Sequence, residues 1–371
     1  MSDTRKTTKP NVPNLRFPGF SGEWASRRIG EDCTVNMCKR IFANQTSEQG
    51  DVPFFKIGTI GGTPDAYITR DLFEEYKAKY NYPHEGEVMI TCAGTVGKTI
   101  VFDGEDAYFQ DSNIVWLSNP KQLYINSFLN YVLSRVNWNK LNSTTITRIY
   151  NDNLRELVIN YPSIKEQEKI VALLSLLDRR IAIQNKVIEK YDSLIKALAH
   201  EIIGKNAPNT MLSECVCCTS STLKESDLSD AGAVPAYGAA GISGFTDNAL
   251  SAGDSLLITK DGSGVGSLRY VSGPHSFVGT MNSMTPRDGF YLPYIYYALH
   301  NVSFETYRTG QAIPHIYFRD YGKERIFCPG YPDQKRIAIG LERIESKMLI
   351  ERYFKEHLLS VKAYLLNALF I

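Results

Sequence analysis

Two clusters of polar and aromatic residues carry the most evident chemistry in this sequence, together with a lysine beside the glycine-rich turn upstream of each. Arg, Asn, Gln, Thr and His side chains can bond to the edges of nucleic-acid bases, and Lys and Arg can hold phosphates. The pattern therefore predicts DNA reading rather than bond making, although each residue taken alone also suits a solvated loop. The candidate contact residues are Lys98, Lys140, Thr144, Arg148 and Asn151 in the first cluster, and Lys260, Arg308, Gln311, His315 and Arg319 in the second.

The glycine-rich segment Gly94–Thr99 imitates a nucleotide-binding loop. Such a loop needs Gly-x-x-x-x-Gly-Lys-Thr, so its first glycine would stand where this sequence has Cys92. The corresponding segment near the second cluster has Ser267 in place of Lys98. A nucleotide-binding site would hardly lose its first glycine in one of these two similar segments and its lysine in the other. We therefore expect each segment to form a tight turn between two strands.

No other arrangement in the sequence indicates catalysis or a resident metal. Asp333, Glu345 and Lys347 imitate a nuclease pattern, but they fall inside a predicted helix. The six histidines form no catalytic or metal-binding pattern, and the seven cysteines lack the paired spacing of a zinc site. We therefore predict a non-enzymatic chain with no metal and no cofactor of its own, whose thiols stay reduced as in the cytoplasm.

Composition and charge restrict the possible partners. No apolar run approaches the roughly 20 residues of a membrane-spanning helix, and the polar start at Met1–Pro10 is unlike a secretory signal, so a cytoplasmic protein without a membrane partner is expected. The net charge is +1; residues 22–160 carry 14 basic and 17 acidic side chains, and residues 208–328 carry 8 and 11. Phosphate neutralisation supplies most non-specific affinity for DNA, so such a chain would bind duplex weakly without partners.

An internal repeat organises the chain. Ile146–Tyr150 (Ile-Thr-Arg-Ile-Tyr) recurs as Ile313–Tyr317 (Ile-Pro-His-Ile-Tyr), at an offset of 167 residues. The same offset relates further residues in the same order, namely Tyr124 to Tyr291, Pro162 to Pro329, Gln167 to Gln334 and Ile170 to Ile337. One matched pentapeptide would be chance, whereas an ordered series indicates a duplication.

Each copy changes character along its length. Short apolar runs between glycine turns predict strands at residues 52–60, 88–91, 99–102 and 114–117, and helical spacing predicts helices at 126–136 and 292–300. The predicted fold class is α/β (α+β), with two repeated mixed α/β domains separated by two long antiparallel coiled-coil helices. The predicted boundaries are an N-terminal arm at 1–21, domain 1 at 22–160, helix 1 at 161–207, domain 2 at 208–328 and helix 2 at 329–371.

A seam of apolar residues with a 3.5-residue period is the clearest physical signal. It runs from Ile170 to Ile202 in a helix expected at Glu166–Ile202, which Ser163 and Glu166 would open as a capping box. The second helix, expected at Asp333–Leu369, keeps the seam but carries some charged residues in it. So narrow a seam favours helix pairing over packing on a domain surface. The seam residues expected to bind a partner are Leu177, Gln184, Ile188, Ile344, Met348 and Glu351.

Together these features resemble the DNA-specificity subunits of type I restriction–modification enzymes. The segment Leu15–Trp24 (Leu-Arg-Phe-Pro-Gly-Phe-Ser-Gly-Glu-Trp) looks like the start of such subunits from Gram-positive bacteria. The Gly-x-Val-Gly segments, the Ile-x-x-Ile-Tyr segments and the Pro…Gln…Ile entries to the long helices are similar to the family in both copies. The charged seam residues of the second helix and the short tail after it depart from the family's pattern.

The resemblance implies a function and a set of partners. Each target-recognition domain would read one half of a bipartite, asymmetric sequence in double-stranded DNA, and the paired helices would serve as a ruler and as a dock for two modification subunits. Those subunits would bind S-adenosylmethionine and methylate adenine, while two restriction subunits would add ATP- and Mg-dependent translocation and cleavage. Half-sites facing one side of the duplex would be centred about one turn, ~34 Å, apart.

Two other functions compete with this interpretation. A coiled-coil adaptor without DNA readout would bind proteins only, but the different polar clusters on a duplicated scaffold favour DNA reading over it. A stand-alone restriction or methylation enzyme is opposed by the missing catalytic motifs.

Overall fold

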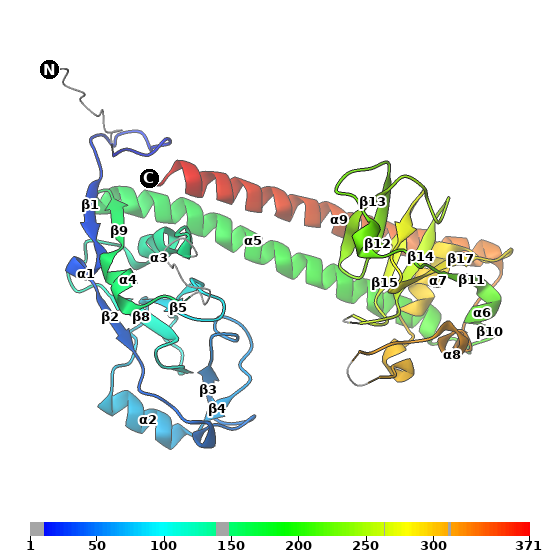
Figure 1. Ribbon diagram of the computed structural model, residues 1–371, viewed down its shortest axis with the longest axis horizontal. Coiled ribbons are helices and arrows are strands. Elements are labelled where there is room, and N and C mark those ends of the chain that lie inside the picture. The colour runs from blue at the N-terminus through cyan, green and yellow to red at the C-terminus, as the bar shows by residue number, and fades with distance from the viewer. Residues whose placement is uncertain (1–10, 139–147, 263, 311–312) are drawn as a thin grey trace. The chain divides into compact units, whose positions relative to one another are not determined.

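The structure, a computed structural model, describes residues 11–138, 148–262, 264–310 and 313–371 (Figure 1). The chain divides into two compact units, unit 1 (Met1–Ala182 with Glu356–Ile371) and unit 2 (Ile183–Lys355). The long helices α5 (Ile164–Ala199) and α9 (Tyr331–Ala368) each contribute one part to each unit. Each unit therefore holds a mixed domain together with a length of both helices.

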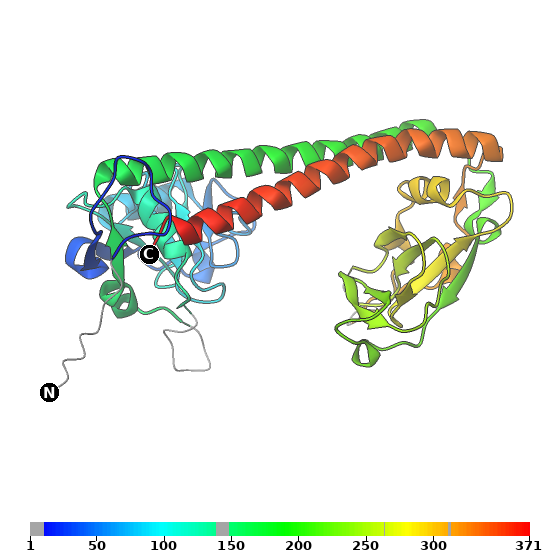
Figure 2. The ribbon, with the colours of Figure 1, turned by 90° about the horizontal axis from the view of Figure 1, so that it is seen from above.

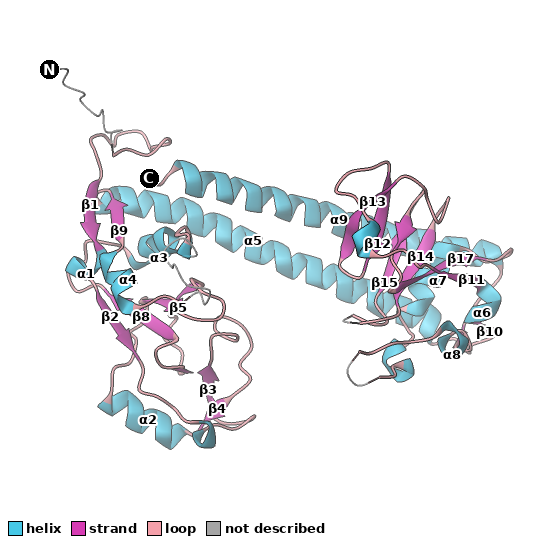
Figure 3. Cartoon of the chain, viewed as in Figure 1, coloured by secondary structure: helices cyan, strands magenta, loops and turns pink. Residues whose placement is uncertain are grey.

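Unit 1 contains domain 1, which extends from β1 to β9. Its strands are β1 (Ala25–Arg28), β2 (Thr34–Met37), β3 (Val52–Phe55), β4 (Tyr67–Ile68), β5 (Val88–Thr91), β6 (Thr99–Val101), β7 (Tyr108–Phe109), β8 (Ile114–Ser118) and β9 (Val158–Tyr161), and its helices are α1 (Ile29–Asp32), α2 (Arg70–Lys79), α3 (Asn126–Ser134) and α4 (Asn151–Glu156). β1 pairs with β9, and two further sheets have the orders β2-β8-β5-β6 and β4-β3-β7 (Figure 3).

The central strands of the four-stranded sheet are buried on both faces. Every residue of β5 is buried, as is β8 from Ile114 to Leu117. Alternate side chains enter different cores, because Met89 and Trp116 pack in one hydrophobic cluster and Val88 and Leu117 pack in another with residues of α3. Strands covered on both faces are continuous apolar runs, which is why the short apolar runs predict them correctly.

Unit 2 contains domain 2, which extends from β10 to β18. Its strands are β10 (Thr210–Met211), β11 (Val216–Ser220), β12 (Val234–Gly238), β13 (Gly241–Thr246), β14 (Ser255–Thr259), β15 (Leu268–Val271), β16 (Ser276–Phe277), β17 (Met281–Pro286) and β18 (Arg325–Ile326), and its helices are α6 (Leu212–Cys215), α7 (Leu292–Leu299) and α8 (Phe318–Tyr321). β10 pairs with β18, and two further sheets have the orders β11-β17-β14-β15 and β13-β12-β16.

The two domains share one topology. Each strand of domain 2 has a counterpart at the same place in domain 1, and both domains contain a parallel pair, β3 with β7 and β12 with β16. The sequence-based prediction of a duplicated mixed fold is therefore confirmed. Domain 1 adds α2 between β4 and β5, where domain 2 has only the loop 247–254; the sequence analysis did not predict this helix.

The predicted helix seam lies between α5 and α9 in each unit. In unit 1, Ile170 and Leu174 share a buried cluster with Leu369 and Phe370, and Leu177 packs against that cluster. In unit 2, Met348 is buried and Ile188 and Ile344 are partly buried in one core. Within each unit the ribbons of α5 and α9 run side by side (Figure 2).

Polar seam residues also pair across the two helices. Lys362 Nζ lies 2.5 Å from Asp178 Oδ1 in unit 1, and Gln184 Nε2 donates to the Glu351 carboxylate in unit 2. In unit 1, Ile170 and Leu174 lie with Leu369 and Phe370 while Asp178, further along α5, lies beside the earlier Lys362, so the helices are antiparallel there. A polar pair inside an apolar seam fixes the register of two helices.

Two details at the ends of α5 differ from the sequence-based expectation. The turn His200–Gly204 is π-helical, which inserts a residue into the repeat; Ile203 is thereby buried at 2 % exposure and the predicted seam residue Ile202 is 40 % exposed. At the other end, the carboxylate of Glu166 does not act as predicted in a capping box with Ser163. It is bound by the guanidinium of Arg16, with Nε–Oε1 and Nη2–Oε2 distances of 2.8 Å.

A buried glutamine anchors each domain to its long helix. In unit 1, Gln167 Oε1 accepts from the backbone N–H of Ile125 at 2.8 Å, and its Nε2 donates to the carbonyls of Leu123 and Pro162. In unit 2, Gln334 makes the corresponding bonds to Tyr291, Gly289 and Pro329. The Pro…Gln motif thus holds the segment that begins α3 or α7.

In unit 2, His300 closes α7 against aromatic side chains. Its ring lies 4.8 Å from that of Tyr296 and 5.9 Å from that of Tyr297, and Tyr297 donates to Glu345 on α9 at 2.5 Å. Burial disfavours the imidazolium and lowers the pKa of His300 below its ordinary value of 6.5, although the charge of Glu345 opposes this effect.

We expect His300 to make unit 2 less stable in acid. In the unfolded chain the imidazole takes up a proton near pH 6.5, whereas the folded state binds that proton only at lower pH. The contribution of His300 to the free energy of unfolding of unit 2 is thus complete above pH 6.5, and it is lost as the pH falls through and below that value. Urea unfolding followed by circular dichroism should show a smaller decline toward low pH for His300→Asn than for the wild type. The control His357→Asn, on an exposed residue of α9, should keep the wild-type slope; equal slopes in all three proteins would contradict the assignment.

Candidate nucleic-acid interface

A tight glycine turn joins β5 to β6 in domain 1, as predicted. The N–H of Gly97 donates to the carbonyl of Thr91 at 2.8 Å, and the N–H of Thr91 donates to that of Lys98 at 3.0 Å. Gly94 and Gly97 have φ angles of +64° and +82°, which only glycine adopts without strain. No room for a side chain remains, because a Cβ on Gly97 would lie 2.1 Å from Cδ1 of Trp138.

The chain that carries the first polar cluster returns to this same turn. The N–H of Ile149 donates to the carbonyl of Cys92 at 2.9 Å, so the segment is attached where β5 ends. Arg148 Nη2 donates to the carbonyl of Ser112 at 3.3 Å, and its guanidinium lies 6.0 Å from the Tyr150 ring, whose residue is 61 % exposed. We call the turn 92–98 and the returning segment 148–150 frame 1.

Frame 1 presents a cation and an aromatic ring next to a neutral thiol. Burial raises the pKa of Cys92 to about 11, although the positive charge of Arg148 opposes this rise. The thiol therefore stays protonated near neutrality, and Arg148 and Tyr150 supply the polar chemistry of the frame.

Domain 2 builds the same frame from different side chains. The N–H of Gly266 donates to the carbonyl of Thr259 at 2.8 Å, and the N–H of Ile316 donates to that of Lys260 at 2.9 Å. A Cβ on Gly266 would lie 2.7 Å from Cβ of Phe304, which occupies the place of Trp138. We call the described turn residues 260–262 and 264–267, together with the returning segment 315–317, frame 2.

His315 is held at the base of frame 2. Its N–H and carbonyl bond to the carbonyl and N–H of Thr309, at 2.8 and 2.9 Å. It also forms a β-bridge with Asp261 in the turn. The His315 ring meets the Tyr317 ring edge to face at 5.5 Å, and Arg319 lies over the same ring at 4.8 Å. Frame 2 therefore places the imidazole of His315 where frame 1 has the guanidinium of Arg148. Its turn adds the carboxylate of Asp261, and the guanidinium of Arg319 lies just beyond the returning segment.

The other predicted contact residues divide into distinct groups. Lys98 extends from the turn to the carbonyl of Ile60, with an Nζ–O distance of 2.5 Å, and Arg308 pairs with Glu305 at 2.7 Å. Asn151 begins α4 directly after frame 1, and Lys260 belongs to frame 2 through its backbone. Lys140, Thr144 and Gln311 lie outside the described residues.

The sequence analysis missed three features of the frames. It assigned Trp138 no place in the glycine turn, whereas the structure buries this residue at 5 % exposure against that turn. The sequence did hold a signal for the role of Trp138, because Phe304 is also aromatic and its distance from Trp138 is close to the repeat offset of 167 residues. Ser112, whose carbonyl holds Arg148, and Asp261 carried no recognisable motif.

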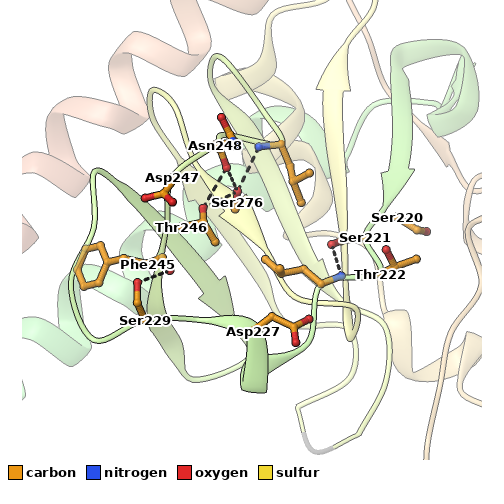
Figure 4. Close-up of a pocket in the computed structure, with 12 residues that line it drawn as sticks. Ser220, Ser221, Thr222, Asp227, Ser229, Phe245, Thr246, Asp247, Asn248 and Ser276 are labelled. Carbon is orange, nitrogen blue, oxygen red and sulfur yellow. Dashed lines mark hydrogen bonds between the residues drawn. The ribbon is translucent and has the colours of Figure 1, made fainter.

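A hollow of about 700 Å³ on domain 2 is a weaker candidate for binding DNA (Figure 4). Its walls carry Asp227 and Asp247, which would repel phosphates. Many of its polar groups are already used by its own loops, since Ser276 Oγ donates to the carbonyl of Asn248 at 2.9 Å and Ser229 Oγ to that of Phe245 at 3.1 Å. The frames therefore remain the better candidates.

The seam residues of α5 and α9 are not free to bind another protein, because in each unit the two helices pack against each other along the seam. Exposed apolar residues lie instead on the other faces of α5 and α9. They are Leu176, Ile183, Leu194, Ile339, Leu349, Ile350, Tyr353, Leu359 and Tyr364, with exposures from 39 to 77 %.

Comparison with known proteins finds similarity to the specificity subunits of type I restriction enzymes. Residues 21–190 match the model of the type I restriction modification DNA specificity domain, and a putative type I restriction enzyme specificity subunit of Haemophilus influenzae is 48 % identical over 161 residues. Residues 21–190, just under half of the chain, are therefore similar to the DNA specificity domain of type I restriction–modification enzymes. The match covers 43 % of this chain and 41 % of the Haemophilus relative, so it spans less than half of either.

Solved structures of specificity subunits share the fold over nearly the whole chain. The S subunit from Mycoplasma genitalium has a TM-score of 0.62 at 19 % identity, covering 97 % of this chain and 99 % of its own. A chain from a study of complex assembly and conformational transition in a type I system has a TM-score of 0.50 at 17 % identity, covering 96 and 98 %. The fold class predicted from the sequence is therefore confirmed.

No group of three or more metal-ligating side chains occurs among the described residues. In the same ranges, no helix combines the length and apolar character needed to cross a membrane.

Proposed function

We propose that this chain is a specificity subunit that reads a bipartite, asymmetric sequence in double-stranded DNA, with frame 1 at one half-site and frame 2 at the other. The observation that carries the proposal is one backbone frame built twice with different side chains on it. Arg148 in frame 1 and His315 in frame 2 offer different hydrogen-bonding groups at corresponding places, and Asp261 adds a carboxylate to frame 2 alone. Base pairs differ in the donors and acceptors they present in the major groove, so such a difference supports readout of two different sequences.

The charge of the chain supports a shared grip on the DNA backbone. With 14 basic against 17 acidic residues at 22–160, and 8 against 11 at 208–328, neither domain has a net positive charge. Phosphate contacts dominate non-specific affinity. We therefore assign most of the contacts to DNA phosphates to partner subunits, and the recognition of bases to this chain.

We further propose that two modification subunits dock on the exposed apolar faces of α5 and α9, and that two restriction subunits join the complex. The modification subunits would hold S-adenosylmethionine and methylate adenine at the directed site. The restriction subunits would hold ATP with Mg and cleave the DNA. A restriction system acts on DNA inside the cell, so the proposed location is the cytoplasm.

Mapping methylated adenines in DNA from cells that contain this chain and its modification partner would test the proposal. We expect one bipartite motif with two unlike halves. Arg148→Ala should relax one half and His315→Ala the other, each by roughly ten- to a hundredfold, because a good base contact contributes ~1–3 kcal/mol of discrimination. Arg155→Ala, which removes an exposed ion pair with Asp152, is the control and should preserve the motif. Methylation without a motif, or equal loss at both halves in both variants, would contradict the division of labour.

A further inference from the structure

Two thiols meet at the root of domain 2. Cys215 is the last residue of α6, and Cys328 lies between β18 and α9. Their sulfur atoms are 3.7 Å apart although the residues are 113 positions apart in the chain. The fold, rather than a local sequence motif, creates this pair.

The surroundings of the two thiols differ in a way that suits redox chemistry. Cys215 is fully buried and lies with its Sγ 3.3 Å from the carbonyl of Met211, whereas Cys328 is partly exposed. Hydrogen bonds from Cys215 and Thr210 lower the pKa of Cys328, against the effect of its burial. A partly exposed thiolate with a second thiol behind it has the features of a nucleophile and its resolving cysteine.

Other thiols of the chain lack these features. Burial raises the pKa of Cys33 and of Cys38 to about 12 and that of Cys218 to about 11. Only a small fraction of each is therefore thiolate near neutrality.

We propose that Cys215 and Cys328 form an oxidisable dithiol that closes to a disulfide in the presence of a hydroperoxide. The Cys328 thiolate attacks the peroxide oxygen, the O–O bond breaks, and Cys328 becomes a sulfenic acid as hydroxide leaves. Cys215 then gives up its proton and attacks the sulfenic sulfur, forming the S–S bond and releasing the second oxygen as water. Overall, two thiols lose two electrons and one hydroperoxide is reduced.

The disulfide would act on one domain only. At the corresponding places domain 1 has Asp32, which accepts a hydrogen bond from Tyr124 at 2.8 Å, and Tyr161, which cannot be oxidised in this way. In domain 2 the new bond would join α6 to the segment entering α9, beside the β10–β18 pair of Met211 with Arg325. Oxidation should therefore stiffen the root of domain 2 and leave domain 1 unchanged. This inference does not depend on the proposed DNA readout.

The test uses the full-length, reduced chain titrated with hydrogen peroxide. After free thiols are alkylated, peptide mass spectrometry should find the Cys215 and Cys328 peptides joined and lighter by two hydrogen atoms, and dithiothreitol should separate them. The thermal transition of unit 2 should move to higher temperature on oxidation and return on reduction.

Cysteine variants supply the controls. Cys328→Ala should abolish the link, and Cys217→Ala, which removes a half-exposed thiol on β11, should leave it intact. If Cys215→Ala does not fold, disulfide mapping of the oxidised wild-type chain still tests the proposal, because it identifies both linked residues. Unlinked thiols after peroxide treatment, further oxidation of Cys328 with Cys215 untouched, or a link that involves Cys217 would each overturn the proposal.

Discussion

A Gly97→Ala variant is expected to lose discrimination at one DNA half-site by roughly ten- to a hundredfold while the other half-site is read normally. The added Cβ would lie 2.1 Å from Cδ1 of Trp138, and the φ angle of Gly97 is +82°. Trp138 or the turn must therefore move, and Ile149, the neighbour of Arg148, is bonded to Cys92 of that same turn. A displaced Arg148 forfeits a directional base contact, which supplies ~1–3 kcal/mol of discrimination. The expectation rests on the proposed function.

Methylation by the assembled complex on two libraries, each with one half-site randomised, measures the effect. Gly104→Ala is the matched control, because Gly104 has a φ of +88° but its added Cβ meets mainly the flexible side chain of Glu85, at 3.2 Å. It therefore introduces similar backbone strain without touching frame 1. If Gly104→Ala relaxes the half-site as strongly as Gly97→Ala, general strain rather than the frame causes the loss.

The corresponding glycines of domain 2 allow the same experiment on the other half-site. Gly266→Ala places a Cβ 2.7 Å from Cβ of Phe304, and Gly273→Ala, at φ +75° with nothing within 4 Å, is its control. Gly266→Ala should relax the half-site that Gly97→Ala leaves intact. Loss at the same half-site in both variants would show that the frames do not read separate halves.

The repeated elements were predictable from the sequence because their signals are local. The Gly-x-Val-Gly turns, the apolar runs of β5 and β8 and the 3.5-residue seam each follow from the positions of residues a few places apart. Their recurrence at one offset then predicted the shared topology of the two domains.

Features that depend on the path of the chain could not be predicted. Arg16 reaches Glu166 across 150 positions, and the pairing of Cys215 with Cys328 spans 113. Lys98 stands in a turn that suggests phosphate binding, but its ammonium is taken by the carbonyl of Ile60. Such partners are set by how strands and loops approach one another, and residue types alone do not specify that approach.

One local feature was missed for a different reason. The helix α2 has an N-cap at Thr69, whose side chain accepts from the N–H of Leu72, and it buries Phe73. Domain 2 has no matching segment, so the repeat that guided the analysis gave no indication of it. An insertion in one copy is the feature that reasoning from repeats is least able to detect.

Gln167→Ala is expected to destabilise unit 1 by ~3 kcal/mol or more, because each buried polar group left without a partner costs ~1–3 kcal/mol. The side chain is fully buried and serves the N–H of Ile125 and the carbonyls of Leu123 and Pro162. Alanine removes all three bonds and leaves one N–H and two carbonyls without these partners. Glu168→Ala changes the adjacent, exposed residue of α5 and should have little effect.

Tryptophan fluorescence separates the two units in this experiment, because the three tryptophans of the chain, Trp24, Trp116 and Trp138, all belong to unit 1. Urea unfolding of Gln167→Ala should shift the fluorescence transition to lower urea. The matched variant Gln334→Ala removes the corresponding bonds in unit 2, so it should shift the transition seen by circular dichroism and move the fluorescence transition much less. If Gln167→Ala is no more destabilising than Glu168→Ala, the glutamine bonds do not explain why Pro…Gln recurs at the entry to each long helix. If Gln334→Ala shifts the fluorescence transition equally, the units unfold together, and the glutamines then stabilise one cooperative structure rather than two separate anchors.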